Sequence, residues 1–120
     1  MTNSRETWES YAKAWKVEDR AAKLAELGRC VAHHAVYCDP VAECRGHDQL
    51  VDYMLDFHKQ VPGGHFQTTY FLVHHGRSIA KWNMMDGAGV RLGEGMSYGE
   101  YGIDGTLVAM TGFFEVPPGP

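Results

Sequence analysis

The sequence predicts an α+β fold in which three N-terminal helices pack on a strongly curved, mixed or antiparallel sheet that forms a cone. Apolar residues recur with helical spacing through the first half of the chain, and from residue 65 they alternate with a period of two. Glycine-containing turns separate the later segments. The 120 residues are expected to form a single domain over 1–116, with a flexible tail at 117–120.

The composition argues against several functional classes. The net charge of −4 leaves no basic excess to bind nucleic acid. No apolar run approaches the ~20 residues of a membrane span, and the polar N-terminus carries no secretory signal. The three cysteines and seven histidines lack CxxC and HExxH spacing, so neither a metal nor a cofactor is predicted. We expect reduced thiols in a cytoplasmic protein.

The first two helices follow from apolar stripes. A helix over 4–16 is predicted from positions spaced i, i+3, i+4 and i+7, which are Trp8, Tyr11, Ala12 and Trp15. A second helix can be capped by Glu18 or Asp19 and is expected to end near 33–34. Its apolar face consists of Leu24, Leu27 and Val31.

A short strand and a third helix are expected next. The strand covers 35–38 and stops at Asp39-Pro40. The helix begins near 46–48 and is broken by the turn at 61–64. Its buried side is predicted to hold Leu50, Val51, Met54, Leu55 and His58.

The second half reads as a meander of strands. They are predicted over 65–75, 77–85, 90–102 and 106–115, with turns at Gly76, Asp86-Gly87 and Asp104-Gly105. Closely spaced glycines in the third of these strands would let it bend sharply. They are Gly93, Gly95, Gly99 and Gly102.

Helices over one face of a curved sheet would enclose a mostly apolar interior, the usual place for a ligand in such a domain. Alternation puts Ala80, Trp82 and Met84 on one face of their strand. In the last strand, Met110, Gly112 and Phe114 share a face. The helices would add Tyr11, Trp15 and Met54.

An ordered set of short motifs spans nearly the whole chain. It consists of Tyr11-x3-Trp15, Tyr37-x-Asp39-Pro40, Arg45-Gly46-x-Asp48-x-Leu50, Trp82, Asp104-Gly105 and Thr111-Gly112-Phe113-Phe114. In these motifs the chain resembles the SnoaL-like, or nuclear transport factor 2-like, cone-fold proteins. That family includes ketosteroid isomerases, polyketide cyclases and limonene epoxide hydrolases, as well as many uncharacterised members.

The resemblance implies a candidate site around Asp39, which matches the general base of ketosteroid isomerases. Tyr11 matches their oxyanion tyrosine. The second oxyanion donor falls at Ser97 in place of an aspartate, and the supporting tyrosine falls at Met54. Ketosteroid isomerase activity itself is therefore not expected. His58 is a further candidate, as a proton carrier. The predicted ligand-binding residues are Trp15, Tyr53, Met54, Phe57, Trp82, Met84, Ser97, Met110 and Phe114.

Two interpretations stay open for Asp39 and for the protein. Asp39 is either a turn carboxylate before a proline or an acid/base group facing the cone. The chain is either a cofactor-independent isomerase, cyclase or dehydratase for a small apolar molecule, or a non-catalytic ligand-binding or interaction module. For both, the resemblance implies a homodimer formed through the outer sheet face, expected to carry Phe71, Val73 and Tyr101.

Overall fold

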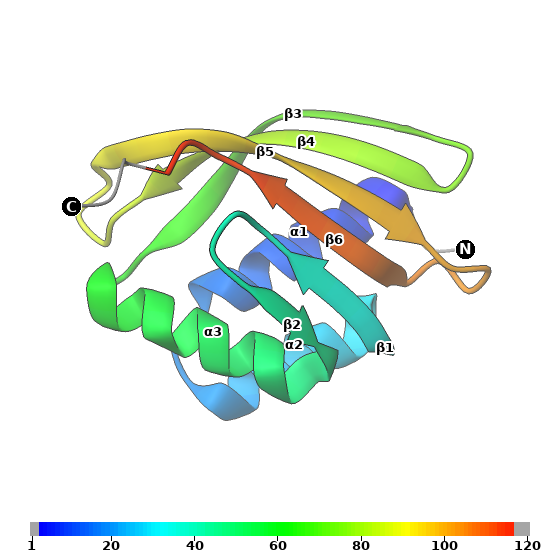
Figure 1. The fold of residues 1–120 in the computed structure, drawn as a ribbon, viewed down its shortest axis with the longest axis horizontal. Helices are drawn as coiled ribbons and strands as arrows, with labels where there is room; N and C mark the ends of the chain where they lie inside the picture. The colour runs from blue at the N-terminus through cyan, green and yellow to red at the C-terminus, as the bar shows by residue number, and fades with distance from the viewer. Residues whose placement is uncertain (1–2, 117–120) are drawn as a thin grey trace.

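The computed structural model describes residues 3–116, which form helices on one side of a curved sheet (Figure 1). The predicted tail at 117–120 lies outside the described residues. The helices are α1 (Ser4–Lys16), α2 (Arg20–Cys30) and α3 (Gly46–Gln60). The strands are β1 (Val31–Cys38), β2 (Glu43–Arg45), β3 (His65–His74), β4 (Arg77–Met85), β5 (Arg91–Tyr101) and β6 (Leu107–Phe113).

The sheet is mixed and open, with strand order β2-β1-β6-β5-β4-β3. β1 runs parallel to β6, and every other neighbouring pair is antiparallel. The predicted α+β class and the curved mixed sheet are confirmed. The meander β3–β5 is joined to the β1–β2 hairpin only through β6, the last strand of the chain.

The boundary between α2 and β1 differs from the expectation. The helix ends at Cys30, and the strand begins at Val31, not at residue 35. Val31 pairs with Leu107 of β6, a long-range contact that outweighs the helical spacing of Leu24, Leu27 and Val31. The short strand β2 was not predicted either. It exists because Cys44 lies opposite Tyr37 in an antiparallel pair.

The α1 stripe is confirmed except for one residue. Trp8, Tyr11 and Trp15 are buried, but the buried alanine of this helix is Ala14 and not Ala12. Asn3 caps the helix by accepting a hydrogen bond from the Arg5 N–H. The hydrophobic core between helices and sheet also includes Leu27, Leu50, Val51, Met54, Leu107 and Met110.

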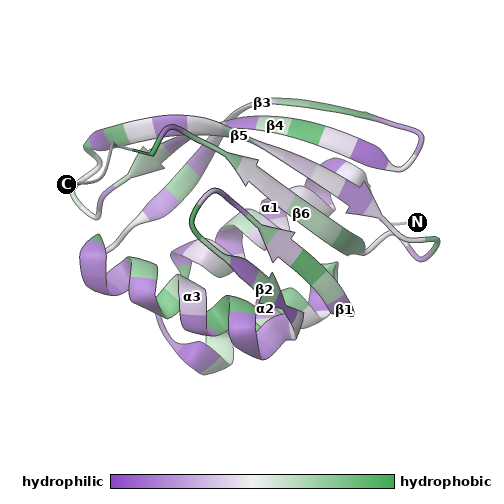
Figure 2. Ribbon diagram, viewed as in Figure 1, coloured by the Kyte–Doolittle hydropathy of each residue, from purple (hydrophilic) through white to green (hydrophobic). Residues whose placement is uncertain are grey.

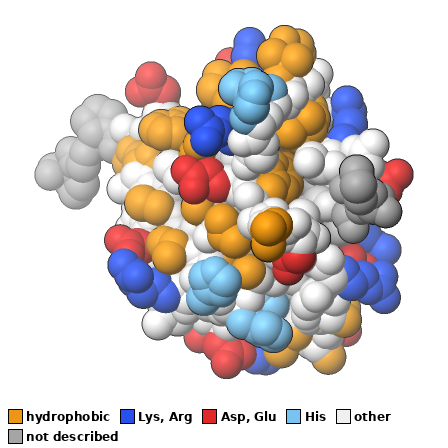
Figure 3. Space-filling model, turned by 90° about the vertical axis from the view of Figure 1, so that its right-hand side faces the viewer, with side chains coloured by type: hydrophobic (Ala, Val, Ile, Leu, Met, Phe, Trp, Pro, Cys, Tyr) orange, Lys and Arg blue, Asp and Glu red, His pale blue; other side chains and the backbone are white. Residues whose placement is uncertain are grey.

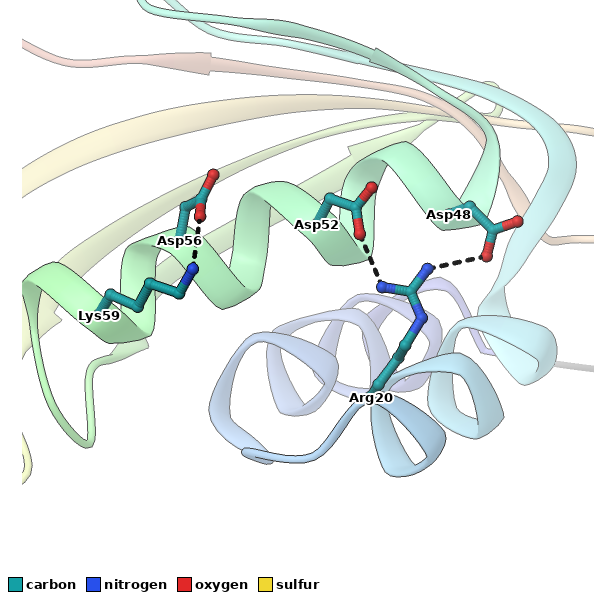
Figure 4. Close-up of polar contacts among 5 residues, drawn as sticks. All are labelled: Arg20, Asp48, Asp52, Asp56 and Lys59. Carbon is teal, nitrogen blue, oxygen red and sulfur yellow. Dashed lines mark hydrogen bonds and ion pairs between the residues drawn. The ribbon is translucent and has the colours of Figure 1, made fainter.

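Exposed ion pairs connect α2 to α3 (Figure 4). The Arg20 guanidinium lies 2.6 Å from Asp52 and 3.2 Å from Asp48, both on α3. Lys59 lies 3.5 Å from Asp56 within α3. Polar residues line the outward side of α3 in Figure 2, whereas β1 and β6 carry many hydrophobic ones. Exposed pairs of this kind contribute little each, so packing of the apolar faces holds the helices in place.

Small residues on the inner face of β5 allow the sheet to curve around the helices. A Cβ added at Gly95 would lie 2.5 Å from the Trp82 ring, and one at Gly99 would lie 3.1 Å from the Trp8 ring. Two large indoles therefore occupy the volume that side chains on β5 would need. This agrees with the bend predicted from these glycines.

The described residues contain no helix long and apolar enough to cross a membrane. The cysteines Cys30, Cys38 and Cys44 are all free thiols. Cys38 and Cys44 lie on adjacent paired strands, but Cys44 is directly opposite Tyr37 and so points to the other face of the sheet from Cys38. The cytoplasmic location stays a prediction.

A buried lysine lies where the three helices meet. Lys23 is fully buried, and its Nζ donates to the carbonyl oxygens of Ala14 and Trp15 at 2.9 and 3.1 Å. It also lies 2.8 Å from Nε2 of His58. Burial lowers the pKa of Lys23 to about 8. Burial and the Lys23 charge also lower the pKa of His58.

We expect the Lys23→Met variant to lose part of the pH dependence of stability. The folded protein binds the Lys23 proton less tightly than the unfolded chain, so this group adds stability as pH rises from about 8 towards 10.5. Urea unfolding across this pH range should show a smaller rise in the free energy of unfolding for the variant than for the native chain. Lys16→Met, at an exposed lysine, is the control and should keep the native slope. Equal slopes for Lys23→Met and the native chain would contradict the assignment.

Candidate functional site

Asp39 directly follows β1 and turns its carboxylate towards the interior between the sheet and α3. Its side chain is 9% exposed. Residues two apart in a strand share a face, so Tyr37 and Asp39 both point inward. The Tyr37 hydroxyl donates to Oδ2 of Asp39 at 2.5 Å, and Tyr53 of α3 donates to the same oxygen at 2.8 Å.

The other carboxylate oxygen serves the turn. Oδ1 of Asp39 accepts hydrogen bonds from the backbone N–H groups of Val41 and Ala42, at 2.8 and 2.9 Å. The two interpretations of Asp39 are therefore not exclusive. One oxygen fixes the β1–β2 turn, as an Asp-Pro step suggests. The other is held by phenol groups in the interior.

These hydrogen bonds assign the protons within the cluster. In both hydrogen bonds the tyrosine hydroxyl is the donor and Oδ2 of Asp39 is the acceptor. Burial, together with the hydrogen bond to Asp39, raises the pKa of Tyr53 above its usual range. Burial and the neighbouring Tyr11 and Asp39 also raise the pKa of Tyr37. The hydroxyl oxygen of each tyrosine can still accept a hydrogen bond from another group.

The floor of the site is made by β4, β5 and β6. Ser97 is paired with Gly112, and a Cβ added at Gly112 would lie 3.5 Å from Cβ of Asp39, 3.7 Å from the Tyr37 hydroxyl and 3.9 Å from Oγ of Ser97. The indole N–H of Trp82 donates to Oγ of Ser97 at 3.0 Å. Gly112 thus lies where the carboxylate, a phenol and a serine hydroxyl converge.

Aromatic rings fill most of the interior beside this cluster. Trp15 is central, with ring centroids 5.2 to 6.1 Å from those of Tyr37, Tyr53, Phe57 and Phe66. Phe66 lies 4.9 Å from Trp82, which lies 6.2 Å from Phe114. The cone predicted as a ligand cavity is therefore largely occupied by the protein's own side chains.

Two depressions on the surface of the described residues are considered as places for a ligand. One, of about 430 Å³, is lined by Pro40, Glu94, Gly95, Phe113, Phe114 and Glu115. Its nearest link to the cluster is Pro40, which directly follows Asp39. The other, of about 740 Å³, includes Glu18, Asp19, His65 and Gly87 and lies at the α1–α2 connection, where none of the cluster residues lines it.

The predicted ligand-binding residues fall into three groups. Those brought together around Asp39 or the aromatic interior are Trp15, Tyr53, Phe57, Trp82, Ser97 and Phe114. Met54 and Met110 are closed into the core, at 0% and 1% exposed. Met84 faces inward but lies farther along the sheet, opposite Phe66 and Gly93.

Neither Tyr11 nor His58 forms a hydrogen bond with Asp39, although Tyr11 is near enough for the Asp39 charge to help raise its pKa. Tyr11 packs against Trp8, with centroids 5.0 Å apart, and the hydroxyls that reach the carboxylate belong to Tyr37 and Tyr53. His58 lies against Lys23 at the helix junction, where its Nδ1 is buried and has no hydrogen-bond partner within the described chain.

Sequence reasoning missed Tyr37 and Phe66 as site residues. The alternation that points Asp39 inward also points Tyr37 inward, so the signal was present in the sequence. Tyr53 was predicted only as a ligand contact, whereas it is a hydrogen-bond donor to the carboxylate. In residues 3–116 no cluster of three or more His, Cys, Asp or Glu side chains has the geometry to hold a metal ion.

Comparison with known proteins agrees with this architecture. The model of the SnoaL-like domain family matches residues 8–110. The search of curated proteins found no match. A candidate isomerase of the SnoaL-like family from Agrobacterium tumefaciens superposes with a TM-score of 0.86 at 20% identity, covering 97% of this chain and 100% of its own.

Two other solved structures show the same fold at lower identity. A candidate polyketide cyclase from Sinorhizobium meliloti has a TM-score of 0.71 at 13% identity, covering 92% of this chain and 99% of its own. A protein with a ketosteroid isomerase-like fold from Catenulispora acidiphila, in complex with trimethylamine, has a TM-score of 0.76 at 13% identity. It covers 95% of this chain and 88% of its own.

We expect Tyr37→Phe to destabilise the fold by about 1–3 kcal/mol, because it leaves a buried carboxylate oxygen with one donor fewer. Tyr53→Phe should cost less, since Tyr53 is partly exposed and water can replace its hydroxyl. Urea denaturation measures both. Tyr98→Phe, which removes a hydroxyl bonded to the exposed Glu100, is the matched control. A cost for Tyr37→Phe no larger than that of the control would show that this hydrogen bond does not stabilise the fold.

Proposed function

This chain belongs to the SnoaL-like domain family, and on that premise we propose that it binds a small, largely apolar molecule beside Asp39 and moves a proton on it without a cofactor. The observation that carries the proposal is the Asp39 carboxylate itself. It is buried, turned inward, and held by two phenols next to an aromatic interior.

We place the ligand in the depression beside β5 and the end of β6. Pro40, Gly95 and Phe114 line it, and each is close in sequence or register to a member of the Asp39 cluster. The apolar body of a ligand would rest on Phe114 and the edge of Trp82, whose ring lies over Gly95. Its polar end would point towards Asp39. Aromatic walls with few polar groups are typical of small-molecule sites.

Proton transfer would use Oδ2 of Asp39. A ligand C–H proton would pass to this oxygen as Tyr53 turns its hydroxyl from the carboxylate to the ligand oxygen that gains negative charge. The proton would then return to another ligand atom, which gives isomerisation, cyclisation or dehydration. The relatives described as a candidate isomerase and a candidate polyketide cyclase support this reaction class.

We expect the native chain to catalyse deuterium uptake from D₂O at the acidic α-carbon of β-tetralone, and Asp39→Asn to lower that rate by about 100-fold or more. Mass spectrometry measures the uptake. The matched control is Asp86→Asn. Asp86 also accepts two backbone N–H bonds in a turn, from Ala88 and Val90, but it lies in the β4–β5 turn.

If Asp86→Asn keeps a rate close to the native one, loss of a turn carboxylate alone does not lower the exchange rate. If Asp39→Asn also matched the native rate, Asp39 would have no part in proton transfer. If Asp39→Asn and Asp86→Asn lost activity equally, the effect would belong to turn stability.

A second candidate function is a non-catalytic binding or interaction module. The filled interior favours it, because Trp15, Phe57 and Phe66 occupy the volume that a large ligand would need. In this case the depression would hold only a small group, or the outer sheet face would be the functional surface. The deuterium-exchange experiment distinguishes the two candidates.

We also propose that the outer sheet face forms a homodimer. The residues expected there need correction: Phe71 faces inward and lies 6.5 Å from Trp8, Tyr101 bonds to Ser78, and Val73 pairs with the buried Ser78. The outward row consists instead of residues that pair directly across four strands. They are Leu72, Ile79, Tyr98 and Thr111.

The chemistry of this row suits a second copy of the chain. It contains no charged side chain, and Leu72 is 52% exposed. The neighbouring row on one side consists of Tyr70, Lys81, Met96 and Phe113, in which Tyr70 and Phe113 are 45% and 57% exposed and Lys81 is the charged member. Elsewhere on the molecule, as in the end view of Figure 3, exposed hydrophobic side chains lie among charged and histidine side chains. An uncharged row at the centre of a sheet is self-complementary across a two-fold axis.

Light scattering after size-exclusion chromatography should give the mass of two chains. Ile79→Lys should shift it to one chain, because it puts a charge in the centre of the row. Ile103→Lys, at a fully exposed turn position, should leave the mass unchanged. A native mass equal to one chain at every dilution would refute the dimer.

A further inference from the structure

We infer that His58 makes the junction of the three helices sensitive to acid: when its ring gains a second proton, the contact with Lys23 must break and the C-terminal half of α3 loosens. His58 was predicted as a proton carrier beside a ligand, but it lies against Lys23. None of the hydrogen-bond partners of Asp39 belongs to this junction. The junction would therefore respond to acid whether or not the chain binds a ligand.

The Lys23 ammonium group uses all three of its protons at this junction. It donates to the carbonyl oxygens of Ala14 and Trp15 at 2.9 and 3.1 Å, and it lies 2.8 Å from Nε2 of His58. The two carbonyls belong to α1, Lys23 to α2 and His58 to α3, so these three contacts join the three helices. Because Lys23 is fully buried, no solvent is beside it to replace a lost acceptor.

These contacts determine which nitrogen of His58 carries the proton. An ammonium group can only donate, so Nε2 of His58 accepts and has no proton of its own. The proton of the neutral ring is then on Nδ1, which is buried and has no hydrogen-bond partner within the described chain. Neither nitrogen can take up another proton while the junction is closed, because Nδ1 already holds one and Nε2 faces the N–H of Lys23.

The charges around His58 also oppose its protonation. Burial lowers the pKa of His58, and the positive charge of Lys23 on α2 lowers it further. Glu18, in the connection between α1 and α2, and nearby backbone groups act in the opposite direction but do not offset this effect. On α3 itself, Asp56 and Lys59 form an ion pair with each other. The pKa of His58 in the closed junction is therefore below its ordinary value of 6.5.

The direction of the pH effect follows from this difference. When the junction opens, His58 meets water and recovers its ordinary pKa of about 6.5. As pH falls below that value, the open form takes up a proton that the closed form cannot bind, so opening becomes more favourable by up to about tenfold for each pH unit. The effect levels off at the lower pKa of the closed form. This pH range is separate from the alkaline range expected for Lys23.

Loosening of α3 would also reach the Asp39 cluster. Tyr53, which donates to Oδ2 of Asp39, lies on the same helix as His58. When the second half of this helix leaves its place, the phenol loses part of its support. Acid would therefore weaken the contact between Tyr53 and the carboxylate without protonating Asp39 itself.

The first experiment locates the ring proton in the native chain. Long-range ¹H–¹⁵N NMR spectra at neutral pH should show the His58 proton on Nδ1, and a pH titration should give a midpoint below 6.5. In Lys23→Met the midpoint should rise, because the neighbouring positive charge is gone. A proton on Nε2 at neutral pH, or a native midpoint of 6.5 or higher, would overturn the inference.

The second experiment measures opening of the helix. Hydrogen exchange of the amides of residues 54–58, corrected for its intrinsic pH dependence, should be about tenfold faster at about pH 5 than at neutral pH. His58→Gln keeps an acceptor for Lys23 but cannot be protonated, so its corrected exchange rate should stay nearly constant. His34→Gln, at an exposed histidine of β1, is the matched control and should keep the native response.

The variants decide whether His58 is the responsible group. The same acceleration in His58→Gln as in the native chain would assign the opening to another group and overturn the inference. If His58→Gln did not fold, the ring proton and the titration midpoint of the native chain would still decide. Neither experiment uses a ligand, so a negative result here would leave the proposed function untouched.

Discussion

The hydrogen bonding of the Asp39 carboxylate is the constraint on which the site depends. Four donors from three parts of the chain meet at one side chain: Tyr37 from β1, Tyr53 from α3, and the N–H groups of Val41 and Ala42 from the turn. A buried carboxylate without such donors would lower the stability of the fold by several kcal/mol. The four hydrogen bonds therefore hold β1, the turn and α3 together around Asp39. The same interaction fixes the β1–β2 turn and the orientation of α3 against the sheet.

This arrangement limits how the carboxylate can react. Each of the two oxygens already accepts two hydrogen bonds, so Oδ2 could take up a proton from a bound molecule only after a tyrosine moved away. Tyr53 is partly exposed whereas Tyr37 is buried, so Tyr53 is the one whose hydroxyl has water beside it to replace the bond. The relatives share the fold at 13–20% identity. At this identity only the fold is shared, and the hydrogen bonds of Tyr37 and Tyr53 to Asp39 are a feature of this chain.

Local sequence patterns predicted most of the fold. Helical spacing located α1 and α3, and alternation with turn glycines located β3 to β6, because each of these signals depends on neighbouring residues only. The end of α2 and the strand β2 were missed because long-range pairings create them, Val31 with Leu107 and Cys44 with Tyr37. Asp39 was found through a family motif and Tyr53 as a ligand contact. Tyr11 was predicted from the resemblance as the tyrosine that polarises a ligand oxygen, but a helix stripe gives no information on which hydroxyl reaches which partner across the core.

The central position of β6 has a consequence for how the molecule is made. The N-terminal segment up to α3 and the β3–β5 meander each expose an unpaired strand edge until β6 inserts between them. β6 follows the other five strands in sequence and ends at Phe113, so a ribosome must synthesise the chain as far as β6 before the sheet can become continuous. Folding is therefore expected to be dominated by late, long-range contacts and to proceed slowly for a chain of this size. During synthesis the edges of β1 and β5 are open to mispairing with other nascent chains, which makes completion of the C-terminal strand the step at which aggregation competes with folding.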